Sequence, residues 1–168
     1  MQRSWFVLFA AAAYLLGCEP RDPVWDMPCS DRPARSIEVG TGGDAFVAAD
    51  AAPIPIQYGS QGGQHIWVSL RLRGFGPEVT TTFGIDDAED PSRIYSGPNA
   101  EHPELRYNAE LERSEAIGMY GYLTTSYDPD TMMERPGPSG RQVTLWAEVA
   151  DECTGGVAIR AEATGTVQ

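Results

Sequence analysis

The chain has 168 residues and carries 12 basic against 24 acidic side chains, for a formal net charge of −12, with no lysine among the basic residues. This length corresponds to one domain of ordinary size. The acidic balance excludes nucleic acid and anionic membrane surfaces as partners that the domain would recognise by charge.

The N-terminal residues have the pattern of an export signal. Arg3 supplies a positive charge, and residues 5–16 form an uncharged, largely apolar run. This run is too short to cross a bilayer, which needs about 20 apolar residues. Its length suits the core of a signal peptide instead. We therefore expect residues 1–17 to be a signal peptide.

The end of this run, Leu15-Leu16-Gly17-Cys18, resembles the lipobox of bacterial lipoproteins. The resemblance implies a diacylglycerol on the sulfur of Cys18, cleavage before this residue, and a further acyl chain such as palmitate on the new amine. Such an anchor is effectively permanent. The residue that follows is Glu19, which by the family's sorting signal favours the outer membrane of the cell envelope. The alternative is an ordinary signal peptide cleaved within residues 10–13.

Residues 18–35 are rich in proline and alternate in charge, which argues against a helix or a central strand. We expect a tether, with Trp25 and Met27 docked on the domain. Once Cys18 is lipidated, Cys29 and Cys153 remain. In an exported protein such a pair usually forms a disulfide; the alternative is two free thiols.

From residue 36 the chain shows short apolar–polar alternations that are broken by Gly, Pro, Asn and Asp, the pattern of strands and turns. Residues 54–58 suit only an edge strand or irregular structure, because Pro55 cannot donate to a ladder. The predicted strands are residues 37–39, 45–49, 54–58, 66–73, 79–83, 93–95, 104–112, 117–125, 142–149 and 157–161.

In the stretch SQGGQHIWVSLRLR, residues 60–73, the last eight residues alternate with period 2. Ile66, Val68, Leu70 and Leu72 form an apolar face, and Trp67 and Arg71 lie on the other face. A phosphate-binding loop needs a helix after its glycines, whereas here a strand follows. Gly62-Gly63 is therefore predicted to be a turn. Residues 104–112 alternate too, although a helix that begins at Pro103 competes with the strand there.

These strands and the lack of a convincing helix predict an all-β domain over residues 36–168. We expect an antiparallel β-sandwich of the immunoglobulin type, with a small β-barrel as the second choice. The Gln-Gly-Gly-x-His strand at 61–65 and the Asp-x-Cys-x-Gly hairpin at 151–155 also resemble uncharacterised lipoproteins of GC-rich bacteria such as myxobacteria. That resemblance implies an immunoglobulin-like surface domain without a known activity.

No residue pattern indicates catalysis or a cofactor. His65 and His102 lack the clustered ligands that zinc requires, and no serine lies in a nucleophile motif. The acidic runs at residues 86–90 and 128–130 lack the spacing of a calcium loop, so solubility is their simpler role and calcium the alternative. We expect a protein that is not an enzyme and has no metal or cofactor.

Four aromatic residues are predicted to point away from the core, namely Trp67, Tyr120, Tyr122 and Trp146. A contiguous outward patch marks an interaction site; the alternative is that these rings pack across strands. We expect a lipid-anchored, non-catalytic envelope module with a structural or protein-interaction role. The alternative function is a glycan- or peptide-binding domain that uses the outward aromatics, with or without calcium.

Overall fold

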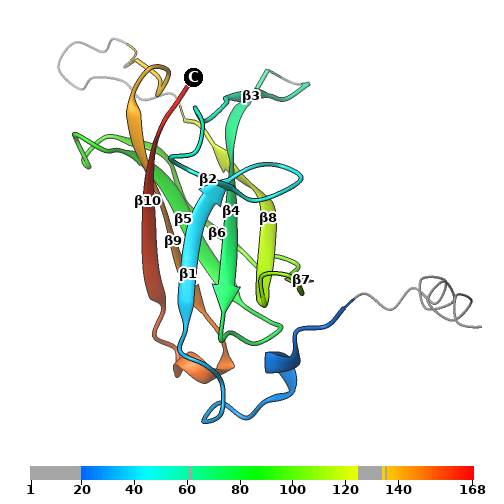
Figure 1. Ribbon diagram of the computed structural model, residues 1–168. Coiled ribbons are helices and arrows are strands. Elements are labelled where there is room, and N and C mark those ends of the chain that lie inside the picture. Colours follow the sequence, from blue (N-terminus) through cyan, green and yellow to red (C-terminus); the bar gives the residue numbers. More distant parts are fainter. Residues whose placement is uncertain (1–19, 61, 125–133, 135) are drawn as a thin grey trace, which may run out of the picture.

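The computed structural model describes residues 20–60, 62–124, 134 and 136–168, and in this part of the chain two antiparallel sheets pack face to face (Figure 1). The predicted β-sandwich is confirmed. The strands are β1 (Ser36–Thr41), β2 (Val47–Ala48), β3 (Gln57–Tyr58), β4 (Gln64–Arg73), β5 (Thr80–Asp87), β6 (Ile94–Glu101), β7 (Arg106–Asn108), β8 (Arg113–Tyr122), β9 (Gln142–Ala150) and β10 (Ile159–Thr166). Among the described residues, two short 3-10 helices, η2 (Pro23–Asp26) and η3 (Glu152–Thr154), complete the elements.

The strand order is that of an immunoglobulin sandwich. The first sheet runs β2-β1-β4-β8-β7, with β3 paired to β4, and the second runs β10-β9-β5-β6. With β1, β4, β7 and β8 as strands A, B, D and E, the first sheet reads A-B-E-D. With β5, β9 and β10 as strands C, F and G, the second sheet reads G-F-C, and β6 lies beside C. The two sheets do not close into the alternative barrel.

The core lies between the sheets and follows the predicted alternation. On β9 every second residue is buried, and on β4 one whole face is buried together with His65 and Ser69 of the other face, because one face of each strand turns to the opposite sheet. The buried members of these two strands' core faces are Ile66, Val68, Leu70, Leu72, Val143, Leu145, Ala147 and Val149. Phe83 and Ile85 of β5 fill the middle of this core and are fully buried.

Strict alternation over the predicted strand 117–125 would place Ile117 on the same face as Met119, and a β-bulge in β8 corrects this prediction. The pairing of β8 with β4 shifts register between Val68 and Leu70, opposite Gly118, whose φ is +75°. The extra residue reverses the alternation. Ala116 is buried before the bulge and Met119 after it, while Ile117 is only half-buried.

The predicted strand at residues 104–112 is wrong over most of its length. Only Arg106–Asn108 forms a strand, β7. The Asn108 side chain then accepts hydrogen bonds from the backbone N–H groups of Glu110 and Leu111, at 3.2 and 3.3 Å. This local turn competes with the ladder and leaves Leu111 42% exposed.

The predicted strand at residues 93–95 is instead the start of a longer one, Ile94–Glu101. The longer strand accommodates Pro98 because β6 is the outer strand of its sheet, where a missing N–H costs no ladder hydrogen bond. The last strand, predicted at residues 157–161, lies nearer the C-terminus than predicted. It begins at Ile159, and Val157 lies before it, 70% exposed.

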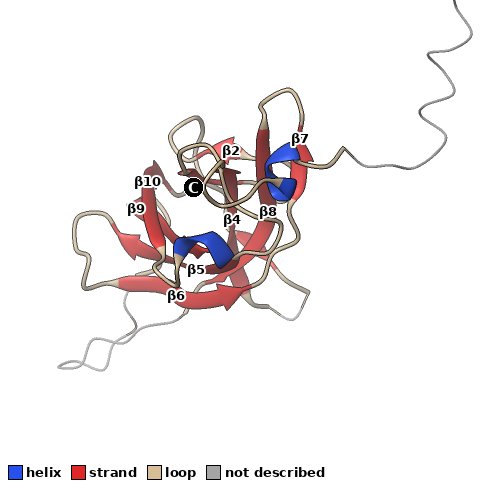
Figure 2. Cartoon of the chain, turned by 90° about the horizontal axis from the view of Figure 1, so that it is seen from below, coloured by secondary structure: helices blue, strands red, loops and turns tan. Residues whose placement is uncertain are grey.

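The N-terminal segment packs on the domain over its described part, residues 20–35, so that only residues 18 and 19 of the predicted tether lie outside the described structure. Asp22 caps η2 through the Val24 N–H and accepts a hydrogen bond from Ser114 Oγ at 2.7 Å. Trp25 packs against the core and Met27 is 38% exposed. Figure 2, which views the molecule from below, shows η2 beside β7, and Figure 1 shows this segment at the lower end of the sandwich. No helix of the described residues is long and apolar enough to cross a membrane.

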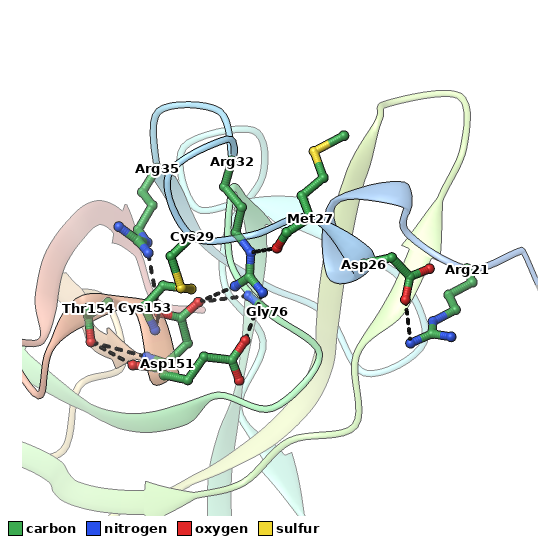
Figure 3. A network of polar contacts seen from close by, with 11 residues as sticks. Arg21, Asp26, Met27, Cys29, Arg32, Arg35, Gly76, Asp151, Cys153 and Thr154 are labelled. Atoms are coloured by element: carbon green, nitrogen blue, oxygen red, sulfur yellow. Dashed lines mark hydrogen bonds and ion pairs between the residues drawn. A yellow bond between two sulfur atoms is a disulfide. The ribbon is translucent and has the colours of Figure 1, made fainter.

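A disulfide and an ionic network fasten this segment to the turn between β9 and β10 (Figure 3). Cys29 and Cys153 are paired, with their Cα atoms 5.4 Å apart. The fully buried Asp151 carboxylate accepts hydrogen bonds from Arg32 Nη1 at 3.1 Å and from the Gly76 N–H at 2.8 Å. A buried carboxylate is tolerated only when it is paired in this way.

Candidate functional site

The outer face of the first sheet carries a cluster of four rings, His65, Trp67, Tyr120 and Tyr122, called the aromatic cluster below. His65 faces Tyr122 and Trp67 faces Tyr120 across the β4–β8 pair. Alternation along both strands places all four side chains on the solvent side. The ring centroids of Trp67 and Tyr120 lie 4.3 Å apart, and those of Tyr120 and Tyr122 lie 5.4 Å apart with the planes at 10°.

One side of the aromatic cluster is covered by the loop between β1 and β2. A Cβ atom on Gly43 would lie 2.8 Å from Trp67 Nε1, so the loop backbone rests on the indole. Ser69 holds the loop there, because its Oγ donates to the Gly42 carbonyl at 2.8 Å and accepts from the Gly118 N–H at 3.0 Å. The loop therefore closes one side and leaves the tyrosines free.

The uncovered side consists of Tyr120 and Tyr122, which are 42% and 56% exposed. An amphipathic ring of this kind combines a large apolar area with a polar tip. Such rings are frequent anchors of protein interfaces. The alternation of the two strands thus brings together three of the four predicted patch residues.

Trp146 does not belong to this patch. It lies on β9 in the second sheet, whose outer face is on the opposite side of the sandwich. The indole lies over Gly84, where a Cβ atom would be 2.6 Å from Trp146 Cζ2, and the Arg160 guanidinium stacks 4.4 Å from its ring centroid. A ring that covers a strand glycine stabilises the sheet, which is the structural alternative that the sequence left open.

His65 is the member of the cluster that sequence analysis missed. It is only 7% exposed, and its ring lies 4.6 Å from that of Trp67 and 4.9 Å from that of Tyr120. Its Nε2 atom has no hydrogen-bond partner among the described residues. The signal was present in the sequence, because His65 and Trp67 share a face of one strand.

An acidic cavity of about 400 Å³ adjoins Tyr120. The carboxylates of Asp44, Glu101 and Glu104 line it, together with Arg106 and the bulge of β8. Burial raises the pKa of Glu101, because removal of water disfavours the charged carboxylate. The aromatic cluster is therefore flanked by a recess with predominantly negative walls.

The acidic run at residues 86–90 serves the fold. Asp87 is 1% exposed, and its carboxylate accepts from Tyr95 Oη at 2.8 Å and from Arg141 Nη1 at 2.5 Å. Burial by itself would raise the pKa of Asp87, but the hydrogen bonds from Tyr95, Arg141 and two backbone N–H groups outweigh burial and lower the pKa to about 2. This carboxylate is already fully engaged.

The remaining predicted residues are dispersed or lie outside the described part of the chain. His102 is exposed and lies after the end of β6, outside the β4–β8 pair that carries His65, and residues 128–130 and Cys18 fall outside the described residues. Within the described ranges, no group of three or more His, Cys, Asp or Glu side chains is arranged to hold a metal ion.

Comparison with known proteins leaves the description at the level of fold. No protein family matches the chain, and neither a curated protein nor a solved structure is significantly similar to it.

Proposed function

We propose that this protein is a lipid-anchored, non-catalytic β-sandwich of the cell envelope that binds another envelope protein through its aromatic cluster. The anchor rests on the lipobox at residues 15–18. The binding role rests on the exposed pair Tyr120 and Tyr122, whose rings lie side by side on the outer face of the first sheet. Side chains of this type at the centre of an interface contribute most of its binding energy.

The position of the anchor relative to the cluster supports this role. The hydrogen bond from Ser114 to Asp22 holds the N-terminal segment against the beginning of β8. Tyr122 is the last residue of the same strand. A rise of about 3.3 Å per residue places Tyr122 about 26 Å farther along the strand. A chain anchored at Cys18 would thus present its tyrosines at the end away from the membrane.

A glycan or a basic peptide is the second candidate ligand. The cavity beside Tyr120 favours it, because a recess of about 400 Å³ lined by Asp44, Glu101 and Glu104 offers acceptors to hydroxyl, ammonium or guanidinium groups. Binding to glycan and peptide arrays, with calcium and with a chelator, separates this function from protein binding. Retention of a glycan that is lost in the Tyr120→Ala variant would select the second candidate.

The aromatic cluster is tested with a photo-crosslinking amino acid at position 122 and, as a matched control, at position 58. Tyr58 is 71% exposed, but it pairs with Gln64 and so belongs to the other side of the sheet. Irradiation of intact cells should yield one discrete crosslinked protein from position 122 and none from position 58. Equal crosslinking from both positions would contradict the proposed role.

The anchor is tested separately by Cys18→Ala. This variant should lose labelling by a radioactive or clickable fatty acid and should leave the membrane fraction. A wild-type protein that takes up no fatty acid label would remove the lipid anchor from the proposal.

A further inference from the structure

The four edges of the two sheets are not protected equally. An unpaired strand edge is a template for another strand, and proteins blunt such edges with short strands, prolines or bulges. The first sheet ends in β2 and β7, of two and three residues. In the second sheet β6 carries Pro98 and two register shifts. By contrast, β10 has eight residues, no proline, and continuous pairing with β9.

The backbone groups that β10 presents at its free edge can be identified. Near its end, Ile54 N–H donates to the Thr166 carbonyl at 2.7 Å, and Gln168 N–H donates to the Ile54 carbonyl at 2.9 Å. Val167 bonds on the other side, with Arg141. Because this direction alternates along a strand, Arg160, Glu162 and Thr164 direct their N–H and C=O groups outward.

We propose that a second copy of this chain pairs with β10 in antiparallel orientation, which joins two four-stranded sheets into one continuous sheet. Two copies related by a two-fold axis present the same strand to each other. The outward backbone groups must face each other, so a residue, and not a peptide bond, lies opposite its own copy at the axis. The two-fold axis must therefore pass beside a residue of β10, which restricts the pairing of the two copies to a few registers.

The charges on β10 select one of these registers. With Ala161 at the axis, Arg160 of each copy faces Glu162 of the other, and each such pair exchanges two backbone hydrogen bonds. With Glu162 at the axis the two carboxylates would oppose each other, and with Arg160 at the axis the two guanidinium groups would do so. Within one copy Arg160 already pairs with Glu162 at 2.8 Å and with Glu148 at 3.1 Å. Opposite charges two residues apart allow the same pairing between copies, whereas equal charges would have protected the edge.

The same register covers apolar surface. Ile159, Ala161 and Ala163 point toward the core but are only half-buried. β1 and the Ala49 backbone approach β10 from the other sheet, but in the described structure no strand pairs with its outer edge before Ile54 at its C-terminal end. With Ala161 at the axis, Ile159 of one copy lies opposite Ala163 of the other. Val157, which is 70% exposed, lies opposite Gly165. The net charge of −12 on each copy opposes association and is screened by salt.

A charge exchange tests the pairing on the full chain, extracted from the envelope in mild detergent at physiological salt. The wild type should be dimeric by native mass spectrometry and by sedimentation at about 100 μM. Glu162→Arg places two like-charged pairs in the interface, as does Arg160→Glu. Each variant alone should show a dimer dissociation constant raised about tenfold or more.

An equimolar mixture of the two variants should restore a dimer of mixed composition, because every facing pair then has opposite charges. That recovery also shows that both variants are folded. A monomeric wild type would overturn the proposal. So would variants that remain dimeric, or a mixture that associates no better than its components.

A cysteine pair tests the register. Residue 161 would face its own copy at about 4.5 Å between Cα atoms, within disulfide range. Ala161→Cys should therefore form a covalent dimer under mild oxidation. The control is Ala163→Cys, on the same face of β10, whose copies would be about 14 Å apart along the strands. Equal dimer formation by both variants would overturn the register.

Discussion

At the level of single residues, neighbouring positions on β4 separate core packing from surface contacts. Leu70 is fully buried, whereas Arg71 lies on the outer face, where its Nε donates to Glu115 at 2.8 Å and its guanidinium stacks 4.2 Å from the Phe46 ring centroid. Leu70→Ala should lower the free energy of unfolding by about 2–5 kcal/mol, because it leaves a cavity. Arg71→Ala should cost about 1 kcal/mol.

Denaturant unfolding of these two variants measures the difference. A larger loss for Arg71→Ala than for Leu70→Ala would mean that the strand faces the other way, and the aromatic cluster would then not be on the surface.

A second prediction for a single residue concerns Asp87 and the dependence of folding stability on pH. Its pKa falls from 3.8 to about 2 on folding, so the unfolded chain binds more protons than the folded one between these values. The stabilisation is complete above the unfolded pKa and is lost as pH falls through the folded pKa. Wild-type stability should therefore decline between about pH 4 and pH 2.

The matched variant for this titration is Asp87→Asn. It should be less stable than the wild type at neutral pH, because Arg141 and Tyr95 lose a charged partner. Its decline between pH 4 and pH 2 should be shallower in denaturant melts. An unchanged slope would show that other carboxylates carry the acid sensitivity.

At the level of elements, the bulge of β8 and the loop over Trp67 form one unit. Gly118 has φ +75°, and a Cβ atom there would lie 2.8 Å from the Gly43 carbonyl oxygen. Gly140 has nearly the same φ, +76°, but no atom within 4 Å of its Cβ position. Both alanine variants bear the strain of a left-handed conformation, about 1–2 kcal/mol, and only Gly118→Ala must also displace the loop.

We therefore expect Gly118→Ala to be the more destabilising of the two variants and to shift tryptophan fluorescence to the red as the indole of Trp67 becomes exposed. Gly140→Ala should leave the spectrum unchanged. If the two variants behave alike, the loop does not depend on close contact with the bulge.

At the level of the whole molecule, the disulfide joins the N-terminal segment to the far end of the chain. Cys29 and Cys153 are separated by 124 residues. In the chain-entropy account, closure of a loop of this size is worth about 4–5 kcal/mol. The double variant Cys29→Ala, Cys153→Ala should lose free energy of unfolding of this order in denaturant melts, with the ionic network of Asp151 retained. Recovery of two alkylatable thiols from envelope-purified protein would contradict the pairing.

Local patterns were sufficient to predict the alternation of β4 and β9, the sandwich, and the pairing of Cys29 with Cys153. Period-2 alternation is a property of each strand by itself, since successive side chains point to opposite faces whatever lies beside the strand. For the same reason Trp67, Tyr120 and Tyr122 could be assigned to an outer face. The cysteine pairing followed from there being only two cysteines besides Cys18.

The tertiary structure decided everything that depends on lateral neighbours. Strand order placed Trp146 on the other sheet, and pairing register brought His65 against the rings of Tyr120 and Tyr122. A bulge with its own long-range partner turned Ile117 out of the core, and a side-chain turn at Asn108 ended β7 early. Such features arise from contacts between residues far apart in the chain, whose pairing a local periodicity does not specify.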